Sequence, residues 1–417
     1  MPRLRPFRGI RYAPMGPLKD LVCPPYDVIT PEEQLRLHER HPYNAVRIEL
    51  PFSESRAPAE RYVRAAAQFR DWLSTGVLTV DGSPSLYVYR QDFEVPAGGP
   101  GEHGQGRVAG VIGALELEGY GQDSGVLPHE ETMPGPIEDR LALLRSCPVN
   151  ISPIYAIYRG GGTLRPYLDS LEPRPPDARF VDYANTLHRV WAIRAPAELD
   201  IVQEAIAAGP MVIADGHHRY ETALAYHGEQ RGSPGGHDAV MCFCVDADAE
   251  DLVVWPFHRA IQAPASPDEV RERLMDSFAT KVLTPDESPS AQLTSGADHP
   301  LVFVLPEEDL LVEISAEEVV AATGARSAAW SSLDVVALHE VVLPALFPDG
   351  VHDIVFTKDR GEVARLVAEQ NWSTGVLLRA PKAADVIDVA SSGERMPQKA
   401  SYFWPKAVTG LVFRSLR

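Results

Sequence analysis

The sequence predicts a mixed α/β (α+β) fold with two domains, a larger one over residues 1–262 and a smaller α+β domain over residues 263–417. Segments with the apolar pattern of strands alternate with segments of helical pattern along most of the chain, which is typical of mixed sheets. A chain of 417 residues is also longer than one hydrophobic core usually serves. A proline-rich break, Ala263-Pro264-Ala265-Ser266-Pro267, marks the expected boundary.

The first domain begins with a helix start and a short alternating segment. Thr30, Pro31 and Glu33 suit an N-cap, a first-turn proline and a capping-box glutamate, so we expect a helix over residues 31–41. Residues 46–50, Val-Arg-Ile-Glu-Leu, alternate in polarity and predict a strand.

The remaining elements follow from the same patterns of periodicity and capping. In the first domain we expect helices at 58–75, 137–146 and 195–208, and strands at 86–93, 107–117, 151–158, 187–193 and 211–214. In the second domain we expect a helix over 266–278, a hairpin of 301–305 with 310–314, helices near 316–323 and 332–347, and strands near 353–357 and 374–379.

Charge and composition narrow the class of protein. Asp and Glu number 58 against 39 Lys and Arg, and the net charge of −19 argues against nucleic acid as a partner. No apolar stretch approaches the roughly 20 residues that span a bilayer. The basic N-terminal segment lacks the apolar region of a signal peptide. We expect a cytoplasmic protein that acts on small molecules without a membrane partner, and a homo-oligomer is left open.

The four cysteines do not form a disulfide framework in a chain of this length. Cys242 and Cys244 alternate along an apolar segment, which places both sulfurs on one face of a strand. Because no second pair accompanies them, two buried thiols are expected rather than half a zinc site.

The segment Ala214-Asp215-Gly216-His217-His218-Arg219-Tyr220 joins an apolar strand to a helix through a tight polar corner. Free backbone N–H groups and the helix dipole favour an anion at such a helix start. The glycine lets the backbone approach an oxyanion, the arginine offers a bidentate guanidinium, and the two histidines are expected to point to opposite sides. The corner predicts a phosphate or carboxylate site. A solvated turn, and a metal site with the aspartate and first histidine as ligands, are the alternatives.

Two further regions offer acid/base groups. His129 and Glu130 are adjacent, and a histidine beside a carboxylate suits proton transfer or the organisation of Mg²⁺. Asp27 lies in a loop, and Glu49 lies on the strand expected at 46–50. Glu49 is either the base for a substrate hydroxyl or the partner of Arg47 in a surface salt bridge.

Two basic groups complete the candidates. His258 and Arg259 end an apolar strand, where they form either a second anion-binding pair or a buried histidine satisfied by backbone groups. Lys399 and Lys406 flank the aromatic run Tyr402-Phe403-Trp404. These lysines either extend along the aromatic rings or close over phosphates or a base.

These motifs resemble those of known proteins. The segment Asp215–Ala223 is similar to the second motif of the ParB/sulfiredoxin superfamily, in which G-x-[HR]-R opens a helix and binds nucleotide phosphates. The wider chain resembles a bacterial family of unknown function labelled ParB/RepB-like. The segments that carry this second resemblance are Pro6–Gly9, Pro24–Ile29, Pro42–Asn44 with Arg47 and Glu49, Pro128–Glu130, Asp139-Arg140, Ser152–Ile154, Asp215–Ala223, His258-Arg259 and Met396–Lys406.

The resemblance implies a ParB/sulfiredoxin-like nucleotide-binding core with a nucleotide cofactor (ATP, ADP or CTP) and Mg²⁺. The superfamily includes a chromosome-partitioning CTPase, an ATP-using sulfinic acid reductase and a free-serine kinase. A kinase of this kind needs a carboxylate to orient the substrate hydroxyl, and Glu49, Asp27 and Glu130, in that order, are the candidates, with His129 beside the last. Asp215 and Glu130 would hold the Mg²⁺ ion.

We therefore expect a nucleotide-dependent phosphotransferase that acts on a small hydroxyl-bearing metabolite. The residues expected to bind the nucleotide are Asp215, Gly216, His217, His218, Arg219, His258, Arg259, Lys399 and Lys406. One alternative is a nucleotide-gated ParB-like binding or regulatory protein without small-molecule chemistry. Another is a metal-dependent hydrolase that uses Asp215, His217, His129 and His258. The chain contains no Walker A, G-x-G-x-x-G, G-x-S-x-G or H-E-x-x-H motif, which excludes the commonest NTPase, dinucleotide, hydrolase and zincin sites.

Overall fold

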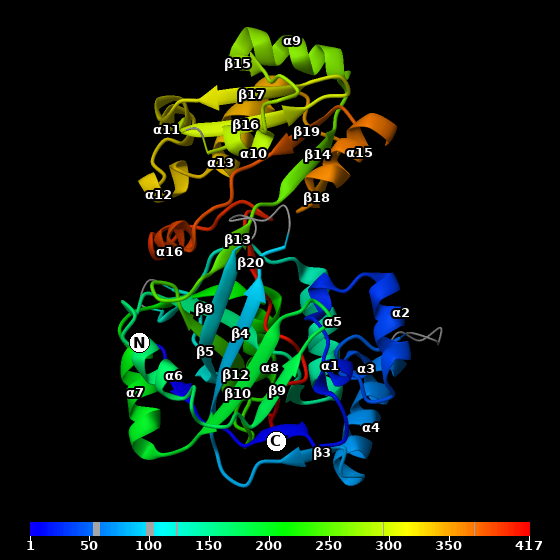
Figure 1. The fold of residues 1–417 in the computed structure, drawn as a ribbon, viewed down its shortest axis with the longest axis vertical. Coiled ribbons are helices and arrows are strands. Elements are labelled where there is room, and N and C mark those ends of the chain that lie inside the picture. Colours follow the sequence, from blue (N-terminus) through cyan, green and yellow to red (C-terminus); the bar gives the residue numbers. More distant parts are fainter. Residues whose placement is uncertain (53–58, 97–103, 122–123, 295, 371) are drawn as a thin grey trace.

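The computed structural model describes residues 1–52, 59–96, 104–121, 124–294, 296–370 and 372–417. The mixed α/β fold expected from the sequence is confirmed, because strands and helices alternate along the chain and gather into two large sheets. Figure 1 shows the larger of these sheets in the lower part of the molecule and the smaller in the upper part. No helix in the described ranges is both long and apolar enough to cross a membrane.

The larger sheet has nine strands in the described part of the chain, in the order β6-β11-β8-β12-β5-β4-β10-β9, with β1 paired to β5. Every residue of its central strand β12 is buried, so both faces of the sheet are covered. The strands are β1 (Leu4–Arg5), β4 (Leu86–Glu94), β5 (Gln105–Glu116), β6 (Val126–Pro128), β8 (Ile154–Tyr158), β9 (Ala178–Val181), β10 (Leu187–Ile193), β11 (Met211–Asp215) and β12 (Ala239–Asp246).

The second large sheet has six strands in the described residues, in the order β15-β17-β16-β19-β14-β18. Its strands are β14 (His258–Gln262), β15 (Ala279–Val282), β16 (His299–Val304), β17 (Asp309–Ile314), β18 (Asp353–Thr357) and β19 (Thr374–Leu377). A two-stranded ribbon of β13 (Val253–Trp255) and β20 (Tyr402–Trp404) lies between the two large sheets (Figure 1).

The chain crosses between its two parts more than once. A small sheet joins β2 (Gly9–Tyr12), β3 (Leu78–Val80) and β7 (Val149–Asn150) to β21 (Phe413–Ser415), so the last strand pairs with elements from the beginning of the chain. Strand β14, which lies before the expected boundary at 262/263, belongs to the six-stranded sheet. The division into domains 1–262 and 263–417 stays a prediction.

The helices pack around these sheets. Their starts follow local capping chemistry: the Thr30 side chain accepts a hydrogen bond from the backbone N–H of Glu33 at 3.2 Å, as expected for a helix beginning at Pro31. The helices are α1 (Leu18–Leu21), α2 (Pro31–Arg40), α3 (Val46–Glu49), α4 (Glu60–Ser74), α5 (Pro134–Ser146), α6 (Arg165–Ser170), α7 (Pro196–Ile206), α8 (His217–Glu229), α9 (Pro267–Ser277), α10 (Pro289–Gln292), α11 (Ala316–Thr323), α12 (Ala328–Ser331), α13 (Asp334–Val336), α14 (Leu343–Leu346), α15 (Arg360–Gln370) and α16 (Ala383–Ser391).

Two expected elements differ from the structure. The strand expected at 46–50 is the short helix α3, and the Asn44 side chain favours this turn by accepting a hydrogen bond from the N–H of Val46, its first residue, at 2.9 Å. The helix expected at 332–347 is present but begins at Asp334, because Leu333 has an extended backbone, and it continues through a π-helical segment at Ala337–Val342 to Leu346. Residue 58, the expected first residue of the helix that includes α4, lies outside the described residues.

The paired cysteines lie as their alternation predicts. Cys242 and Cys244 are buried on one face of β12 with their Sγ atoms 3.5 Å apart, and both are free thiols. Burial and the neighbouring thiol raise the pKa of Cys242, which keeps it in the neutral form.

Candidate functional site

Strand β11 passes into helix α8 through Gly216, as the sequence predicts. Gly216 is the N-cap residue and has φ 89° and ψ 31°, a left-handed conformation that favours glycine. A Cβ atom at this position would lie 3.0 Å from the guanidinium of Arg219. The absence of a side chain therefore lets Arg219 fold back over the start of its own helix.

Asp215, at the end of β11, pairs with two cations. Its Oδ2 accepts a hydrogen bond from Nη2 of Arg219 at 2.7 Å, and its Oδ1 pairs with Nζ of Lys406. Burial raises the pKa of Asp215, but Lys406 and Arg219 outweigh burial and lower it overall. Asp215 is thus an ionised carboxylate that holds two cations at the helix start.

Asp27 brings a second carboxylate close to this ion pair. It lies in the one-turn helix Tyr26–Val28, is exposed to solvent, and accepts no hydrogen bond from another residue in the described part of the chain. Crowding by surrounding protein raises the pKa of Asp27, the charge of Asp215 raises it further, and Arg219 and Lys406 only partly oppose this. We call Asp27, Asp215, Arg219, Lys399 and Lys406 the anion site.

His129 and His217 support this site from the interior. The two rings have centroids 4.6 Å apart, and the backbone N–H of His129 donates to Nε2 of His217 at 3.3 Å. His129 Nδ1 lies 2.6 Å from the carbonyl of Ile213, and its Nε2 lies 3.0 Å from Oγ of Ser401, so a neutral ring donates to the first and accepts from the second. Burial lowers the pKa of both histidines, so they act as neutral spacers rather than as cations.

The other histidine of the corner points away from His217. Nε2 of His218 accepts a hydrogen bond from the backbone N–H of Met133 at 3.0 Å, which ties the loop before α5 to α8. Burial lowers the pKa of His218 as well. The expectation that the two histidines point to opposite sides agrees with these contacts, and each ring nitrogen that accepts a backbone N–H is unavailable to a phosphate.

Lys399 is held by its backbone from both sides. Its N–H donates to Oε1 of Glu130 at 3.2 Å, and its carbonyl accepts from Nη2 of Arg259 at 3.1 Å. Its φ of 54° is left-handed, an unusual conformation for a lysine. The side chain of Lys399 is exposed, with Nζ 5.5 Å from the centroid of the Phe257 ring.

His258 and Arg259 lie on β14, within the six-stranded sheet. Burial lowers the pKa of Arg259 to about 9, and burial with nearby arginines lowers the pKa of His258 to about 4. Nδ1 of His258 accepts the N–H of Leu378 at 3.2 Å, and Arg259 bonds to backbone carbonyls. The side chains of His258 and Arg259 are thus buried and bound to backbone groups. They do not open onto the anion site.

Glu49 lies behind Arg219. Its carboxylate is 2% exposed and accepts a hydrogen bond from Oγ of Ser152 at 2.8 Å, while Nη1 of Arg219 donates to the same Oγ at 3.1 Å. Glu49 and Arg219 also line a cavity of about 50 Å³ together with Arg140. The alternative in which Glu49 pairs with Arg47 does not hold, because α3 is a helix and Arg47 donates to the carbonyls of His38 and His41.

The candidate metal ligands are occupied by other partners. Asp215 is paired with Lys406 and Arg219, and Glu130 accepts from the backbone of Lys399. Within the described residues, no group of three or more His, Cys, Asp or Glu side chains is arranged to hold a metal ion. His258 is bound to Leu378, so the set of four ligands expected for a metal-dependent hydrolase is not assembled.

Two residues beside the anion site were not named as candidates from the sequence. Lys358 follows β18, and Tyr402 belongs to β20. The aromatic run that contains Tyr402 was noticed, but a single lysine after a strand has no local pattern that distinguishes it from a surface lysine. Only the approach of β18 to β20 reveals it.

A sequence model of one family matches residues 4–336, and its description is "Protein of unknown function (DUF1015)". The expectation of a ParB/RepB-like family is wrong, because this match assigns most of the chain to a different family. No curated protein matches the sequence.

Several solved structures are similar to this chain at low identity. A mutant of free serine kinase in complex with ADP has 13% identity and a TM-score of 0.36, with 70% of this chain and 89% of that chain covered. SbnI with a C-terminal truncation from Staphylococcus aureus has 10% identity and a TM-score of 0.37, covering 70% and 82%. A conserved hypothetical protein from Pyrococcus furiosus has 12% identity and a TM-score of 0.32, covering 69% and 92%.

Proposed function

The chain belongs to the DUF1015 family, and we propose that it binds a nucleotide at the anion site and transfers a phosphoryl group to a small hydroxyl-bearing metabolite. One observation carries this proposal. An exposed carboxylate without a hydrogen-bonding partner from another described residue, Asp27, lies close to the ion-paired cluster of Asp215, Arg219 and Lys406 at the start of a helix.

The cationic part of the site would bind phosphate. The N-terminus of α8 presents free backbone N–H groups and the positive end of the helix dipole. Arg219 and Lys406 add two full positive charges, and Asp215 positions both. Phosphoryl transfer depends mainly on such positioning and charge stabilisation.

Asp27 would accept the proton of the attacking hydroxyl. Its pKa is raised by surrounding protein and by Asp215, which brings it closer to neutral pH and makes the carboxylate a stronger base than an ordinary aspartate. Glu49 is buried and bound to Ser152, so in this proposal it positions Arg219 instead of acting as the base.

Mg²⁺ would enter with the nucleotide. This ion is usually held mainly by substrate phosphates, with one or two carboxylates, and it would neutralise charge on the transferred phosphoryl group. Asp215 and Glu130 would be its protein ligands only by exchanging their present partners, Arg219 and Lys406 for Asp215 and the Lys399 N–H for Glu130. Both carboxylates lie close enough to His129 to raise its pKa against the larger effect of burial.

The test is incubation of the purified chain with ATP, ADP or CTP and Mg²⁺, with serine as the first acceptor. Serine is the smallest amino acid with a hydroxyl, so it is a simple probe for an acceptor of this class. Phosphoserine is measured by mass spectrometry, and nucleotide binding by the shift in melting temperature. We expect turnover with at least one nucleotide. No nucleotide-dependent shift and no phosphorylated product with a panel of small hydroxyl compounds would contradict the proposal.

A variant separates the anion site from nonspecific binding. Lys406→Gln removes one cation of the anion site and is expected to weaken nucleotide binding about tenfold, because a charge-assisted contact is lost. Lys281 lies on β15 and forms an exposed ion pair with Glu287, so Lys281→Gln serves as the control. Equal nucleotide affinity in both variants would place binding elsewhere.

A further inference from the structure

Lys358 and Lys406 meet at one aromatic ring. Nζ of Lys358 is 3.7 Å from the centroid of the Tyr402 ring, and Nζ of Lys406 is 4.4 Å from it. Lys358 follows β18 of the six-stranded sheet, whereas Lys406 follows β20 and pairs with Asp215 of the nine-stranded sheet. Two ammonium groups from distant parts of the chain are therefore held close together.

Acidic side chains neutralise these two charges only in part. Asp215 already pairs with Lys406 and Arg219, and no carboxylate of the residues that the structure describes lies within ion-pair distance of Lys358. Partial burial and the charge of Lys406 lower the pKa of Lys358. In a chain with a net charge of −19, a partly buried lysine that has no ion-pair partner in the described residues and lies beside a second lysine indicates that a bound anion is the missing partner.

We propose that Lys358, Lys406 and Tyr402 form a subsite for the second of two linked phosphate groups, so that the anion site selects polyphosphates over monophosphates. This inference rests on the proposed function. One phosphate group is held by Arg219, Lys406 and the start of α8, and Lys358 binds the next phosphate beside the Tyr402 ring. An ammonium group suits a phosphate oxygen as a compact charge, and the ring keeps both lysine side chains in place.

The ligand in this arrangement joins the two large sheets. Lys358 is carried by the six-stranded sheet, and Asp215 and Arg219 are carried by the end of β11 and the start of α8. A bound polyphosphate therefore contacts residues of both sheets at once. A monophosphate reaches only the part of the site around Arg219 and Lys406.

The experiment compares ADP, AMP and inorganic pyrophosphate by isothermal titration calorimetry with the full chain. Lys358→Gln is expected to weaken ADP and pyrophosphate binding about tenfold and AMP binding less than about twofold, because only the second phosphate loses a charged partner. Lys358→Arg keeps the charge and is expected to restore most of the affinity. Lys19→Gln is the matched control, since Nζ of Lys19 lies 5.1 Å from another tyrosine ring, Tyr183, away from the site.

The outcomes separate this inference from the proposed function. If the wild-type chain binds ADP and Lys358→Gln binds it equally well, the subsite is wrong and the proposed function stands. If the wild-type chain binds neither ADP nor AMP here, and neither ATP nor CTP in the test of the proposed function, both are wrong. If Lys358→Gln fails to fold, the wild-type chain still tests the subsite. Pyrophosphate is expected to protect Lys358, but not Lys19, from chemical acetylation, which is mapped by mass spectrometry. Equal modification of Lys358 with and without pyrophosphate overturns the subsite.

Discussion

Asp27 and Glu49 are both carboxylates near Arg219, but their surroundings suit them to different roles. Glu49 is 2% exposed and bound to Ser152, which in turn accepts from Arg219. Asp27 is exposed, and its carboxylate has no hydrogen-bond donor from another described residue. Because a base must reach a substrate hydroxyl, the geometry favours Asp27 over Glu49, which ranked first from the sequence.

Asp27→Asn is expected to lower kcat by at least about 100-fold, because the amide cannot accept the hydroxyl proton. The dissociation constant for ADP is expected to stay nearly unchanged, since Asp27 does not pair with the cations of the site. In the wild-type chain, kcat/KM is expected to rise with pH through the raised pKa of Asp27, as only the ionised carboxylate is a base. Steady-state kinetics check both statements, with the exposed Asp200→Asn on α7 as the control. Full activity of Asp27→Asn would exclude this residue as the base.

The corner between β11 and α8 depends on the conformation of one glycine. Gly216 has a positive φ, and an added Cβ would meet the Arg219 guanidinium at 3.0 Å. Gly228, near the end of the same helix, has no atom within 4 Å of an added Cβ. The two glycines therefore have opposite expected responses to the same substitution.

Gly216→Ala is expected to destabilise the chain by about 1–2 kcal/mol and to weaken nucleotide binding, because it strains the backbone and displaces Arg219. Gly228→Ala is expected to stabilise it by about 0.5–1 kcal/mol, since alanine favours a helix more than glycine does. Thermal and denaturant unfolding measure both changes. Equal effects of the two substitutions would show that the left-handed conformation of Gly216 does not matter.

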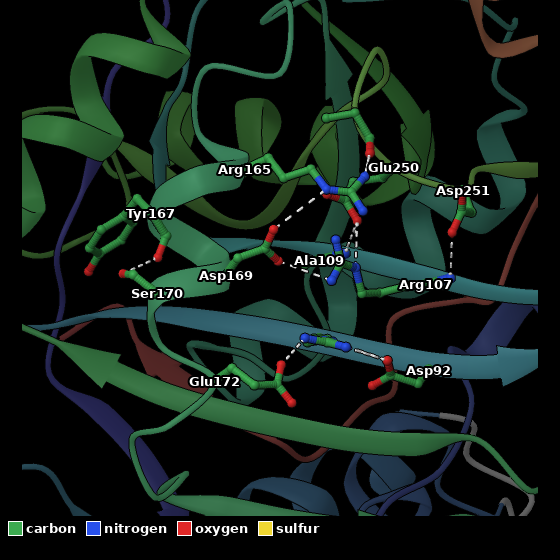
Figure 2. Close-up of polar contacts among 12 residues, drawn as sticks. Asp92, Arg107, Ala109, Arg165, Tyr167, Asp169, Ser170, Glu172, Glu250 and Asp251 are labelled. Carbon is green, nitrogen blue, oxygen red and sulfur yellow. Dashed lines mark hydrogen bonds and ion pairs between the residues drawn. The ribbon is translucent and has the colours of Figure 1, made fainter.

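The connection between β12 and β13 carries a buried acid. Oε2 of Glu250 accepts the N–H of Ala109 on β5 at 2.9 Å, and the side chain is 1% exposed. Figure 2 shows this acid beside Arg107 and Arg165, with Asp169 between the two arginines. Burial raises the pKa of Glu250 to about 7, although Ala109 and the arginines oppose this shift.

The stability of this connection is expected to depend on pH. Because the folded pKa of Glu250 lies above the ordinary value, folding favours its neutral form, and stability falls as pH rises from about 4.5 through 7, by on the order of 3 kcal/mol. Glu250→Gln keeps the acceptor for Ala109 and removes the titration. The melting temperature of the variant is therefore expected to exceed that of the wild type clearly at pH 8 and only slightly at pH 5. A difference that does not change with pH would contradict the raised pKa.

At the scale of the whole molecule, the last residues of the sequence complete structures that the first residues begin. Phe413 is fully buried, with its ring centroid 5.8 Å from that of Tyr12 and 5.7 Å from that of Phe69. Strand β20 pairs with β13, and the carbonyl of Lys406 accepts from Nε2 of Gln91 at 3.0 Å. The segment that carries Lys406 is thus built into the part of the chain that carries Asp215.

A fragment of residues 1–262 is expected to lack a cooperative thermal transition, because it loses β20, β21 and the ring of Phe413. The loss of a buried phenylalanine alone costs about 3–5 kcal/mol. Circular dichroism melts of the fragment and the full chain provide the comparison. A cooperative melt of the fragment would support a boundary at 262/263 as that of an independent folding unit.

Local chemistry made part of this protein predictable from its sequence. The Thr30 cap, the alternation of Cys242 and Cys244, and the strand, corner and helix around Gly216 each depend on residues a few positions apart. Residues 46–50 were misassigned because a five-residue alternation is weak evidence, and the Asn44 side chain bonds to the N–H of Val46 at the start of a helical turn there.

The sequence by itself therefore determined the mixed α/β class and the strand-to-helix corner at Asp215–Arg219. It did not determine which carboxylate and which lysines would join that corner, because Asp27, Lys358 and Lys406 lie far from it along the chain. Their approach depends on the order of strands in the two large sheets and on the return of β20 between them. Only the tertiary structure decided those pairings, since contacts between distant segments arise from how buried faces pack together and not from any local pattern.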